Sequence, residues 1–583
     1  MGNALPSRHG GDRIAETLSA HGVLRLFTLC GGHISPILTA AKARGIRVID
    51  VRDEATAVFA ADAEGRLTGI PGVAAVTAGP GLTNAVTAMQ NARLAQSPLV
   101  LLCGGVPTAL RGRGALQDID QRATIAPHAK RVIQVRRVAD LQPALETAFA
   151  TAIADIPGPV FLETPVDLLY DEATIRSWYV QAASKGKSLA EHVQRWYLRR
   201  HVEHLFAGSR RLHSQAHAPQ RPPSTSRSSL NAALAALKTA KRPLAVIGSQ
   251  ALSIPGNARD VAAAIDAIGI PVYLSGMARG LLGRDHPLQM RHRRREALRE
   301  ADCVVLAGVP CDFRLGYGGD IRRTSTLVAA NRSRADATLN RRPTIAAIGD
   351  AGAFLTNLAA EGAVSDAMQD DWIARLHERD AEREREIAES ERLPGEYVNA
   401  ISLLRAIDRF ADERATFVAD GGDFVATASY LLHPRAPLSW LDPGVFGTLG
   451  VGAGFALASA VARPQREVWA LFGDGACGYA LAEFDTFVRH RIGLIAIVGN
   501  DACWSQIARE QVKMLGDDVG TVLARTAYHE VAAGFGALGL LVRTESEIEP
   551  ALSRARESAR AGVPALVNVW LERNDFREGS ISM

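Results

Sequence analysis

Two short polar segments in the last third of the chain contain the residue types of a magnesium site. Asp474 lies between two glycines directly after an apolar run, residues 468–472, and Asn500 follows a second apolar run, residues 494–498. If these runs are parallel strands joined by a right-handed crossover, both loops lie at one edge of the sheet. The Asp474 carboxylate, the Asn500 amide and the carbonyl of Ala502 then form a hard oxygen site that suits Mg²⁺ and also holds a diphosphate.

A glycine-flanked aspartate alone is more often an ordinary turn between a strand and a helix than a metal site. The asparagine after the second apolar run reverses that preference. The combination resembles the binding motif of thiamine diphosphate (ThDP). In that motif Asp474, Asn500 and Ala502 would hold the metal, and the amides of Gly475 and Ala476 would meet the diphosphate.

Glu54 is a candidate acid–base residue in the first third of the chain. It opens a predicted helix, residues 55–62, that is rich in apolar side chains. Taken alone, such a carboxylate usually complements the helix dipole. Among apolar neighbours it can instead hydrogen-bond N1′ of an aminopyrimidine and share a proton with that ring. Protonation there converts the 4′-amino group to an imino base, which takes the proton from C2 of the thiazolium.

Apolar runs that alternate with glycine turns and alanine-rich helices predict the elements that position these residues. The pattern is typical of doubly wound parallel sheets, and it recurs in three parts of the chain. We therefore predict an α/β protein with three doubly wound parallel-sheet domains, which are pyrimidine-binding, central and diphosphate-binding. The predicted boundaries are 1–170 for the first domain, 171–229 for a linker with an amphipathic helix, 230–365 for the central domain, 366–394 for a connecting helix and 395–583 for the last domain.

Length and composition are those of a soluble globular protein. The 583 residues, 47% of them apolar and 22% charged, allow about three or four domains. We find no run of about 18 apolar residues and no secretory signal, so we expect a cytoplasmic protein without a membrane span. The six cysteines lack metal-type spacing and are expected to be reduced core thiols. A net charge of +4 does not indicate nucleic-acid binding.

Three motifs in the first third extend the resemblance. Residues 52–54, 77–84 and 112–117 fall in the order seen in the pyrimidine-binding domain of the ThDP-dependent acetolactate synthase family. They look most like its acetolactate-synthase-like branch, which includes 2-hydroxyacyl-CoA lyase 2. The resemblance implies that Glu54 activates the cofactor and that Gln117 faces the thiazolium.

The same resemblance assigns the residues around the pyrimidine. Thr77, Pro80 and Asn84 would line the ring. His33 stands after paired glycines, where acetolactate synthases carry a small residue, and with Gly32 it would touch the substrate. A lone histidine can equally be a helix cap, so both interpretations of His33 stay open.

The central domain resembles the one that binds FAD in acetolactate synthases and the ADP part of CoA in acyl-CoA lyases. Pro310 replaces the leading arginine of the corresponding segment, which argues against FAD, whereas Arg314 persists. Arg279 and Arg284, in a glycine-rich loop after a strand, are the other predicted nucleotide contacts. The basic cluster at 291–295 is usually a solvated helix face, and attraction of CoA phosphates is the alternative.

In the last domain the resemblance places diphosphate contacts at Gly422, Asp423 and Phe424. Acetolactate synthases carry a Gln-His pair in place of Asp423 and Phe424, so we expect these contacts to depend on main-chain amides. Leu449 would wedge between the two rings of the cofactor, and the Gly447 carbonyl would accept from the 4′-amino group. Without that role, Leu449 would be ordinary packing at a helix entry.

Trp504, Gln506 and Ile507 are predicted to form a wall of the substrate pocket, and the tail at 575–583 is predicted to close over it, by analogy with C-terminal lids. In the family, the cofactor bridges the first and last domains of two subunits. We therefore expect a homodimer or homotetramer.

Two substrate classes fit ThDP chemistry. A 2-hydroxyacyl-CoA would be split to an aldehyde and formyl-CoA, with ligation as the reverse reaction. A 2-oxo acid such as pyruvate would instead lose CO₂ and join a second carbonyl compound. The branch resemblance, the altered FAD segment and His33 favour the first class. A catalytically silent ThDP-binding protein is a third hypothesis, and the intact Glu54 argues against it.

Overall fold

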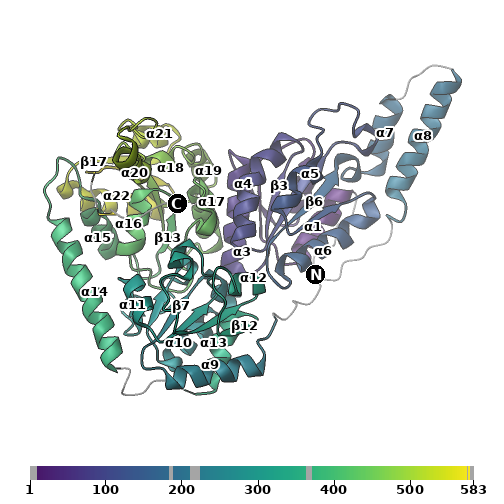
Figure 1. The fold of residues 1–583 in the computed structure, drawn as a ribbon. Coiled ribbons are helices and arrows are strands. Elements are labelled where there is room, and N and C mark those ends of the chain that lie inside the picture. Colours follow the sequence, from purple (N-terminus) through teal and green to yellow (C-terminus); the bar gives the residue numbers. More distant parts are fainter. Residues whose placement is uncertain (1–8, 183–187, 210–222, 363–369, 574–575, 578–583) are drawn as a thin grey trace. The chain divides into compact units, whose positions relative to one another are not determined.

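The computed structural model describes residues 9–182, 188–209, 223–362, 370–573 and 576–577. The chain divides into two compact units, Met1–Gln220 and Arg221–Met583. One six-stranded parallel sheet lies in the first unit and two lie in the second, each flanked by helices (Figure 1). The predicted fold class is thereby confirmed. Within the described ranges, no helix has the length and apolarity needed to cross a bilayer.

The first sheet has the strand order β2-β1-β3-β4-β6-β5. Its strands are β1 (Arg25–Thr28), β2 (Arg47–Asp50), β3 (Gly72–Val76), β4 (Leu99–Gly105), β5 (Arg131–Gln134) and β6 (Pro159–Pro165). Its helices are α1 (Gly10–Ala20), α2 (Ser35–Ala43), α3 (Glu54–Thr68), α4 (Pro80–Leu94), α5 (Gln121–Ile125) and α6 (Leu141–Ile153). The side chain of Asp53 caps α3 by accepting from Ala55 N over 2.7 Å, and the helix ends at the left-handed Gly69. Pro80 begins α4, where its missing N–H costs nothing.

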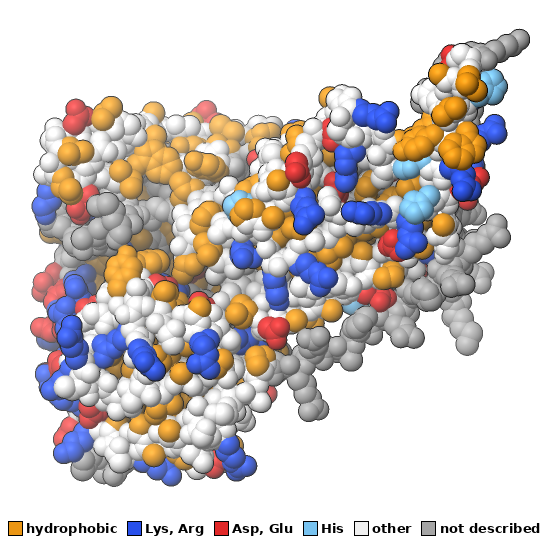
Figure 2. Space-filling model, turned by 45° about the vertical axis from the view of Figure 1, so that its right-hand side comes forward, with side chains coloured by type: hydrophobic (Ala, Val, Ile, Leu, Met, Phe, Trp, Pro, Cys, Tyr) orange, Lys and Arg blue, Asp and Glu red, His pale blue; other side chains and the backbone are white. Residues whose placement is uncertain are grey.

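A pair of helices, α7 (Glu172–Ala182) and α8 (Leu189–Phe206), follows the first sheet within the predicted linker. One side of α8 packs onto the core of the first unit through Val202 and Leu205. Its other side, together with α7, exposes large apolar side chains, which Figure 2 shows beside basic and histidine side chains at the outer end of the pair. They are Trp178, Leu189, Val193, Trp196 and Tyr197.

The central sheet has the strand order β12-β11-β10-β7-β8-β9, which is the order of dinucleotide-binding folds. Its strands are β7 (Pro243–Ile247), β8 (Val272–Leu274), β9 (Gln289–Met290), β10 (Cys303–Ala307), β11 (Thr326–Asn331) and β12 (Ile345–Ile348). The helices of this part are α9 (Arg227–Thr239), α10 (Ala258–Ile268), α11 (Arg294–Glu300), α12 (Arg334–Ala337), α13 (Ala351–Ala360) and α14 (Asp370–Glu391). The long helix α14 occupies the predicted connecting segment.

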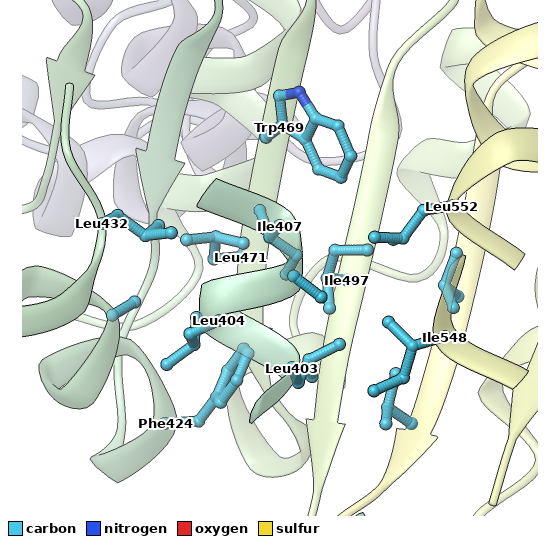
Figure 3. Close-up of a cluster of buried hydrophobic side chains, with 14 of the residues drawn as sticks. Leu403, Leu404, Ile407, Phe424, Leu432, Trp469, Leu471, Ile497, Ile548 and Leu552 are labelled. Carbon is cyan, nitrogen blue, oxygen red and sulfur yellow. The ribbon is translucent and has the colours of Figure 1, made fainter. Parts of the chain in front are cut away.

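The third sheet has the strand order β14-β13-β15-β16-β18-β17. Its strands are β13 (Thr416–Ala419), β14 (Trp440–Leu441), β15 (Val468–Gly473), β16 (Ile495–Asn500), β17 (Leu538–Val542) and β18 (Ala565–Trp570). Its helices are α15 (Ala400–Phe410), α16 (Asp423–Leu431), α17 (Val451–Ala462), α18 (Asp474–Cys477), α19 (Glu483–Arg489), α20 (Ser505–Leu515), α21 (Tyr528–Gly534) and α22 (Ile548–Arg560). Leu404 and Ile407 of α15 and Leu552 of α22 pack on Leu471 and Ile497 of the strands (Figure 3). This core fixes the strands whose carboxyl ends carry the predicted metal ligands.

The first and third sheets therefore share one strand order, because β1 to β6 correspond in turn to β13 to β18. In both, the chain leaves the first strand toward one edge and later returns to begin the strand on its other side. Such a reversal opens a crevice outside the carboxyl ends of two neighbouring strands. These strands are β1 and β3 in the first sheet, and β13 and β15 in the third.

Candidate active site

Glu54 lies at the first position of α3, at the carboxyl edge of the first sheet, and its side chain is 6% exposed. Asn84 Nδ2 donates to Glu54 Oε2 over 3.0 Å. Oε1 accepts no hydrogen bond from the residues in the described ranges. It lies against Gly81, where an added Cβ would sit 3.4 Å away. Asn84 thus orients the carboxylate and leaves Oε1 for a ligand.

His33 and Thr77 meet at the crevice of the first sheet. A hydrogen bond of 3.0 Å joins His33 Nδ1 to Thr77 Oγ1. Added Cβ atoms at Gly31 and Gly104 would overlap Thr77 and His33 respectively, so both glycines are needed for this close approach. Burial lowers the pKa of His33, and the imidazole is therefore neutral at pH 7. Gly32 lies in open space beside it.

Gln117 lies against the turn that starts α4. Gly79 has φ +64°, and an added Cβ there would lie 2.8 Å from the Gln117 carbonyl oxygen. Gln117 itself has φ +66°, a left-handed conformation that costs a non-glycine residue on the order of 1 kcal/mol. Pro80 follows Gly79 as the first residue of α4. The structure therefore brings all the predicted residues of the first domain to one edge of one sheet.

A buried polar network behind this edge was not among the predicted site residues. Gln121 Oε1 accepts from Gly79 N over 3.1 Å, and Gln121 Nε2 donates to Glu163 Oε1 over 3.0 Å. Arg111 donates to the same Glu163 oxygen over 2.8 Å. The network ties the Gly79 turn to the segment that leads into Gln117. The signal in the sequence was Glu163, a charged residue inside the apolar run that forms β6.

In the third sheet, β15 and β16 pair in parallel with Gly473 opposite Gly499. This register places Asp474 and Asn500 next to each other at the carboxyl edge, with side chains 3% and 0% exposed. Asp474 Oδ2 accepts from Cys503 N over 3.2 Å, which ties the two loops together. The structure thus brings together the residues that the spacing predicted as metal ligands.

The electrostatics of this edge fit a divalent cation. Burial and the neighbouring Asp501 carboxylate raise the pKa of Asp474 to about 6, and burial also raises the pKa of Asp501. A bound cation would relieve both penalties. In the described parts of the chain, no three His, Cys, Asp or Glu side chains cluster as metal ligands, so an ion here would rely on the amide and carbonyl oxygens as well.

The carbonyl of Ala502 is held in a defined direction. Ala502 has φ +56°, and Arg573 donates to its oxygen over 2.8 Å and to the Asp501 oxygen over 3.0 Å. The same oxygen also accepts from Leu523 N over 3.0 Å. A carbonyl oxygen has two lone pairs, so a metal that bound here would take the place of one of these two donors. Arg573 is therefore a further residue of the site that was not among the predicted ones.

Glycines form the crevice between β13 and β15. Gly473 N donates to Gly421 O over 3.4 Å, and Gly422 has φ +104° at the start of α16. Asp423 forms a two-point ion pair with Arg509 of α20, at 2.8 and 3.1 Å. The ring of Phe424 belongs to the hydrophobic core, so only its main chain remains available to a diphosphate.

Two further predicted residues, Gly475 and Ala476, are the second and third residues of α18. Gly475 N already donates to Asp474 Oδ1 over 2.8 Å, and Ala476 is buried. An added Cβ at Gly475 would overlap the Trp504 ring, so the indole covers this glycine. Gln506 is half-buried and Ile507 is exposed on the first turn of α20.

The predicted wedge residue Leu449 packs against Gly421, where an added Cβ would overlap its Cδ2 atom. Leu449 is half-buried, and Gly447 is exposed with φ +65°. Of the predicted C-terminal lid, only Phe576 and Arg577 are described, and Phe576 packs on the core of the third sheet. Residues 575 and 578–583 lie outside the described residues.

The three predicted nucleotide arginines make protein contacts. Arg279 donates to Ser429 O over 2.5 Å and stacks on Trp440. Arg284 forms an ion pair with Asp408 at 2.8 Å. These two arginines connect the central and last domains.

The third, Arg314, pairs with its neighbour Asp312 at 2.6 Å. In the cluster at 291–295, Arg291 also reaches the last domain, donating to the carbonyls of Tyr430 and Leu432 over 2.8 and 2.9 Å. These contacts favour a structural role for Arg279, Arg284, Arg314 and Arg291 over nucleotide binding.

Comparison with family models gives matches in three segments of the chain. The family model described as the N-terminal TPP binding domain of thiamine pyrophosphate enzymes matches residues 8–124. The models of the central domain and of the C-terminal TPP binding domain match residues 230–358 and 420–569.

Individual relatives match over nearly their full length. The chain is 48% identical to 2-hydroxyacyl-CoA lyase 2 of Homo sapiens, over 99% of this chain and 92% of that protein. It is 46% identical to the protein of the same name from Danio rerio, over 99% and 94% of the two chains. It is 35% identical to acetolactate synthase large subunit IlvG of Mycobacterium tuberculosis, over 96% and 95%. The chain therefore belongs to the thiamine pyrophosphate enzyme family, and it is a ThDP-dependent enzyme.

Proposed function

We propose that this enzyme is a ThDP- and Mg²⁺-dependent carbon–carbon lyase that cleaves a 2-hydroxyacyl-CoA to an aldehyde and formyl-CoA and also catalyses the reverse ligation. The relatives named 2-hydroxyacyl-CoA lyase 2 support this substrate class, at 46–48% identity over 99% of the chain. The observation that carries the proposal is the Glu54 carboxylate, oriented by Asn84 with Oε1 left for a ligand.

When bound, ThDP supplies a carbon nucleophile and an electron sink for the breaking carbon–carbon bond. Glu54 Oε1 holds the proton that is exchanged with the pyrimidine ring, and Asn84 keeps the carboxylate in place during that exchange. Asp474, Asn500 and the Ala502 carbonyl would hold Mg²⁺ at the diphosphate.

His33 is the proposed base for the substrate. Thr77 engages Nδ1, and Nε2 makes no hydrogen bond within the described ranges. A neutral imidazole accepts the proton of the 2-hydroxyl group at Nε2 while the bond between C1 and C2 of the acyl group breaks. C2 leaves as the aldehyde, and C1 takes up one proton to become formyl-CoA, so the two products together contain the atoms of the substrate.

The central sheet is the proposed site for the ADP part of CoA. Its strand order is that of dinucleotide-binding folds. Gly248 and Gly308 pack closely at the crevice between β7 and β10, where an added Cβ on either would overlap the other loop. FAD is the alternative ligand of this domain, and Pro310 argues against it.

We also propose a homodimer or homotetramer. Glu54 belongs to the first unit and Asp474 to the second, and a dimer would let each subunit contribute one half of two shared sites.

A second candidate function is decarboxylation of pyruvate followed by carboligation, because the Mycobacterium tuberculosis acetolactate synthase subunit is 35% identical. Incubation of the holoenzyme with 2-hydroxyacyl-CoA and, separately, with pyruvate distinguishes the two. We expect an aldehyde and formyl-CoA from the first substrate and no acetolactate from the second. Acetolactate as the main product would reverse the assignment, and a holoenzyme inert toward both would favour a catalytically silent protein.

A further inference from the structure

Asp420 is a buried carboxylate with no role in the chemistry derived above. It follows β13 directly, is 2% exposed and lies at the crevice of the third sheet. Its two oxygens accept from two main-chain amides, Gly450 N over 3.0 Å and Gly452 N over 2.7 Å. A carboxylate that divides its oxygens between two amides fixes the position of the segment that carries them.

The segment that Asp420 holds is the start of α17. Gly450 is the N-cap residue, with φ +88°, and no side chain caps the helix from that position. The first amides of a helix have no partner inside the helix. Asp420, from a different element, provides partners for the amide of the N-cap residue and for that of Gly452.

Close packing makes this arrangement rigid. An added Cβ at Gly452 would lie 2.8 Å from Asp420 Oδ2 and would overlap the ring of Phe472. On the other side, Leu449 packs on Gly421, the residue directly after Asp420. Leu449 is thus confined between the loop after β13 and the turn that Asp420 holds.

We propose that Asp420 is a positioning residue that sets the placement of Leu449, and thereby the affinity of the site for the organic part of ThDP, with little effect on the diphosphate and its metal. This inference rests on the ThDP site of the proposed function and is independent of the substrate. If the enzyme cleaved no 2-hydroxyacyl-CoA, the binding behaviour described below would still be expected.

The test compares two ligands on the full-length protein. Affinities for ThDP and for inorganic pyrophosphate, each with MgCl₂, are measured by isothermal titration calorimetry for wild type, Asp420→Asn and Leu449→Ala. Asparagine keeps the size of the side chain but replaces one of the two acceptor oxygens with an NH₂ group, which cannot accept from the amide that faces it. We expect Asp420→Asn to weaken ThDP binding about 10-fold or more, as is typical for loss of a residue that orients ligands, and to leave pyrophosphate binding within about twofold.

Asp350→Asn is the matched control. Asp350 is also a buried carboxylate that caps a helix, α13, but it lies in the central domain. We expect this variant to bind both ligands as wild type does. The double variant Asp420→Asn/Leu449→Ala should bind ThDP no more weakly than Leu449→Ala alone, because both changes act on the same side chain.

Equal weakening of both ligands in Asp420→Asn, or unchanged ThDP affinity in the folded variant, would overturn the proposal. If Asp420→Asn does not fold, Gly421→Ala tests the same placement, since the new methyl group displaces Leu449 and leaves both bonds of Asp420 intact. Selective loss of ThDP affinity in Gly421→Ala is the expected result. Unchanged ThDP affinity there would equally refute the proposed placement.

Discussion

Thr77 stands at the end of β3 in the first sheet, and Asp474 stands at the end of β15, the corresponding strand of the third sheet. The strands on the other side of these crevices are β1 and β13. Leu29 follows β1, whereas the buried Asp420 follows β13. The crevice of the first sheet is thus neutral, and its acid, Glu54, lies to one side on α3. The crevice of the third sheet is anionic.

This difference shows how one strand order serves two purposes. A neutral edge with hydrogen-bonding groups suits an aromatic heterocycle, and a single carboxylate beside it can exchange a proton with the ring. An edge with several buried carboxylates suits a divalent cation and, through it, a diphosphate. The folds are alike because the backbone topology creates the crevice, while the residues after two strands determine the ligand.

The largest expected effect is a loss of turnover on replacement of Glu54, the acid beside the crevice of the first sheet. Glu54→Gln keeps the shape of the side chain and removes its acid–base function, so we expect turnover to fall about 10³-fold, within the range of lost general acid–base catalysis. ThDP affinity should change much less, because Asn84 and Thr77 remain. Steady-state kinetics with saturating ThDP, together with calorimetric titration, measure the two effects separately. A variant with full turnover would remove Glu54 from the mechanism.

A change in the predicted metal loop of the third sheet should lower cofactor affinity more than turnover, which is the reverse of the result expected for Glu54→Gln. Asp474→Asn is expected to weaken binding of ThDP with Mg²⁺ about 100-fold and to restore much of the turnover when both are added in large excess. Titration of the apoenzyme with MgCl₂ at fixed ThDP gives the affinity. If Asp474→Asn lowered turnover at saturation as much as Glu54→Gln does, the proposed division of roles between the two sheets would be wrong.

A third prediction concerns the buried acid at the anionic crevice. Burial raises the pKa of Asp420 from 3.8 to about 7, against the two amide donors that favour its ionised form. A carboxyl with a raised pKa binds its proton in the folded state at pH values where the unfolded chain has released it. Its contribution to stability is therefore lost as pH rises from about 4 to about 7. The free energy of unfolding of the wild type, minus that of Asp420→Asn, should fall by roughly 1–3 kcal/mol over that range.

Urea denaturation of both apoproteins at pH 5, 6, 7 and 8 measures this difference, in which the contributions of the other titrating groups largely cancel. If the difference between the two free energies of unfolding stayed constant with pH, the pKa of Asp420 would be the same in the folded and unfolded states. If it rose with pH, the two amide donors would lower the pKa of Asp420 by more than burial raises it.

The smallest effect is expected at the left-handed residues, which both sheets carry: Gln117 in the first unit and Ala502 in the second. Ala502→Gly should raise the free energy of unfolding by about 0.5 kcal/mol, because glycine adopts φ +56° without strain. Ala508→Gly, inside α20, is the control and should lower it by about 1 kcal/mol. If both changes were destabilising by the same amount, Ala502 would not be strained.

Local patterns in the sequence carry much of this architecture. Apolar runs ending in glycine turns predict the parallel strands, and the order of those runs is enough to bring Asp474 and Asn500 to one edge. Asp53 and Pro80 indicate the starts of α3 and α4 by ordinary helix-capping rules.

Partners from distant segments are what the sequence does not reveal. Gln121 and Glu163 meet only because α5 and β6 fold against each other, and Arg573 reaches the Ala502 carbonyl from the end of β18. Arg279 and Arg284 look like phosphate ligands in the sequence. A basic residue in a glycine-rich loop can either bind a phosphate or make a structural contact within the protein, and the sequence does not distinguish the two. Their carbonyl and carboxylate partners in the last domain become visible only in three dimensions.

The central claim is that one subunit's Glu54 and its partner's metal loop serve the same cofactor, and complementation tests it most directly. The inactive variants Glu54→Gln and Asp474→Asn are unfolded together, refolded as a mixture and assayed at limiting ThDP. Random pairing gives one intact site in each mixed dimer, so the account predicts a return of activity to about a quarter of the wild-type value. Activity no higher than the sum of the two variants refolded separately, in a mixture shown to contain mixed dimers, would contradict it.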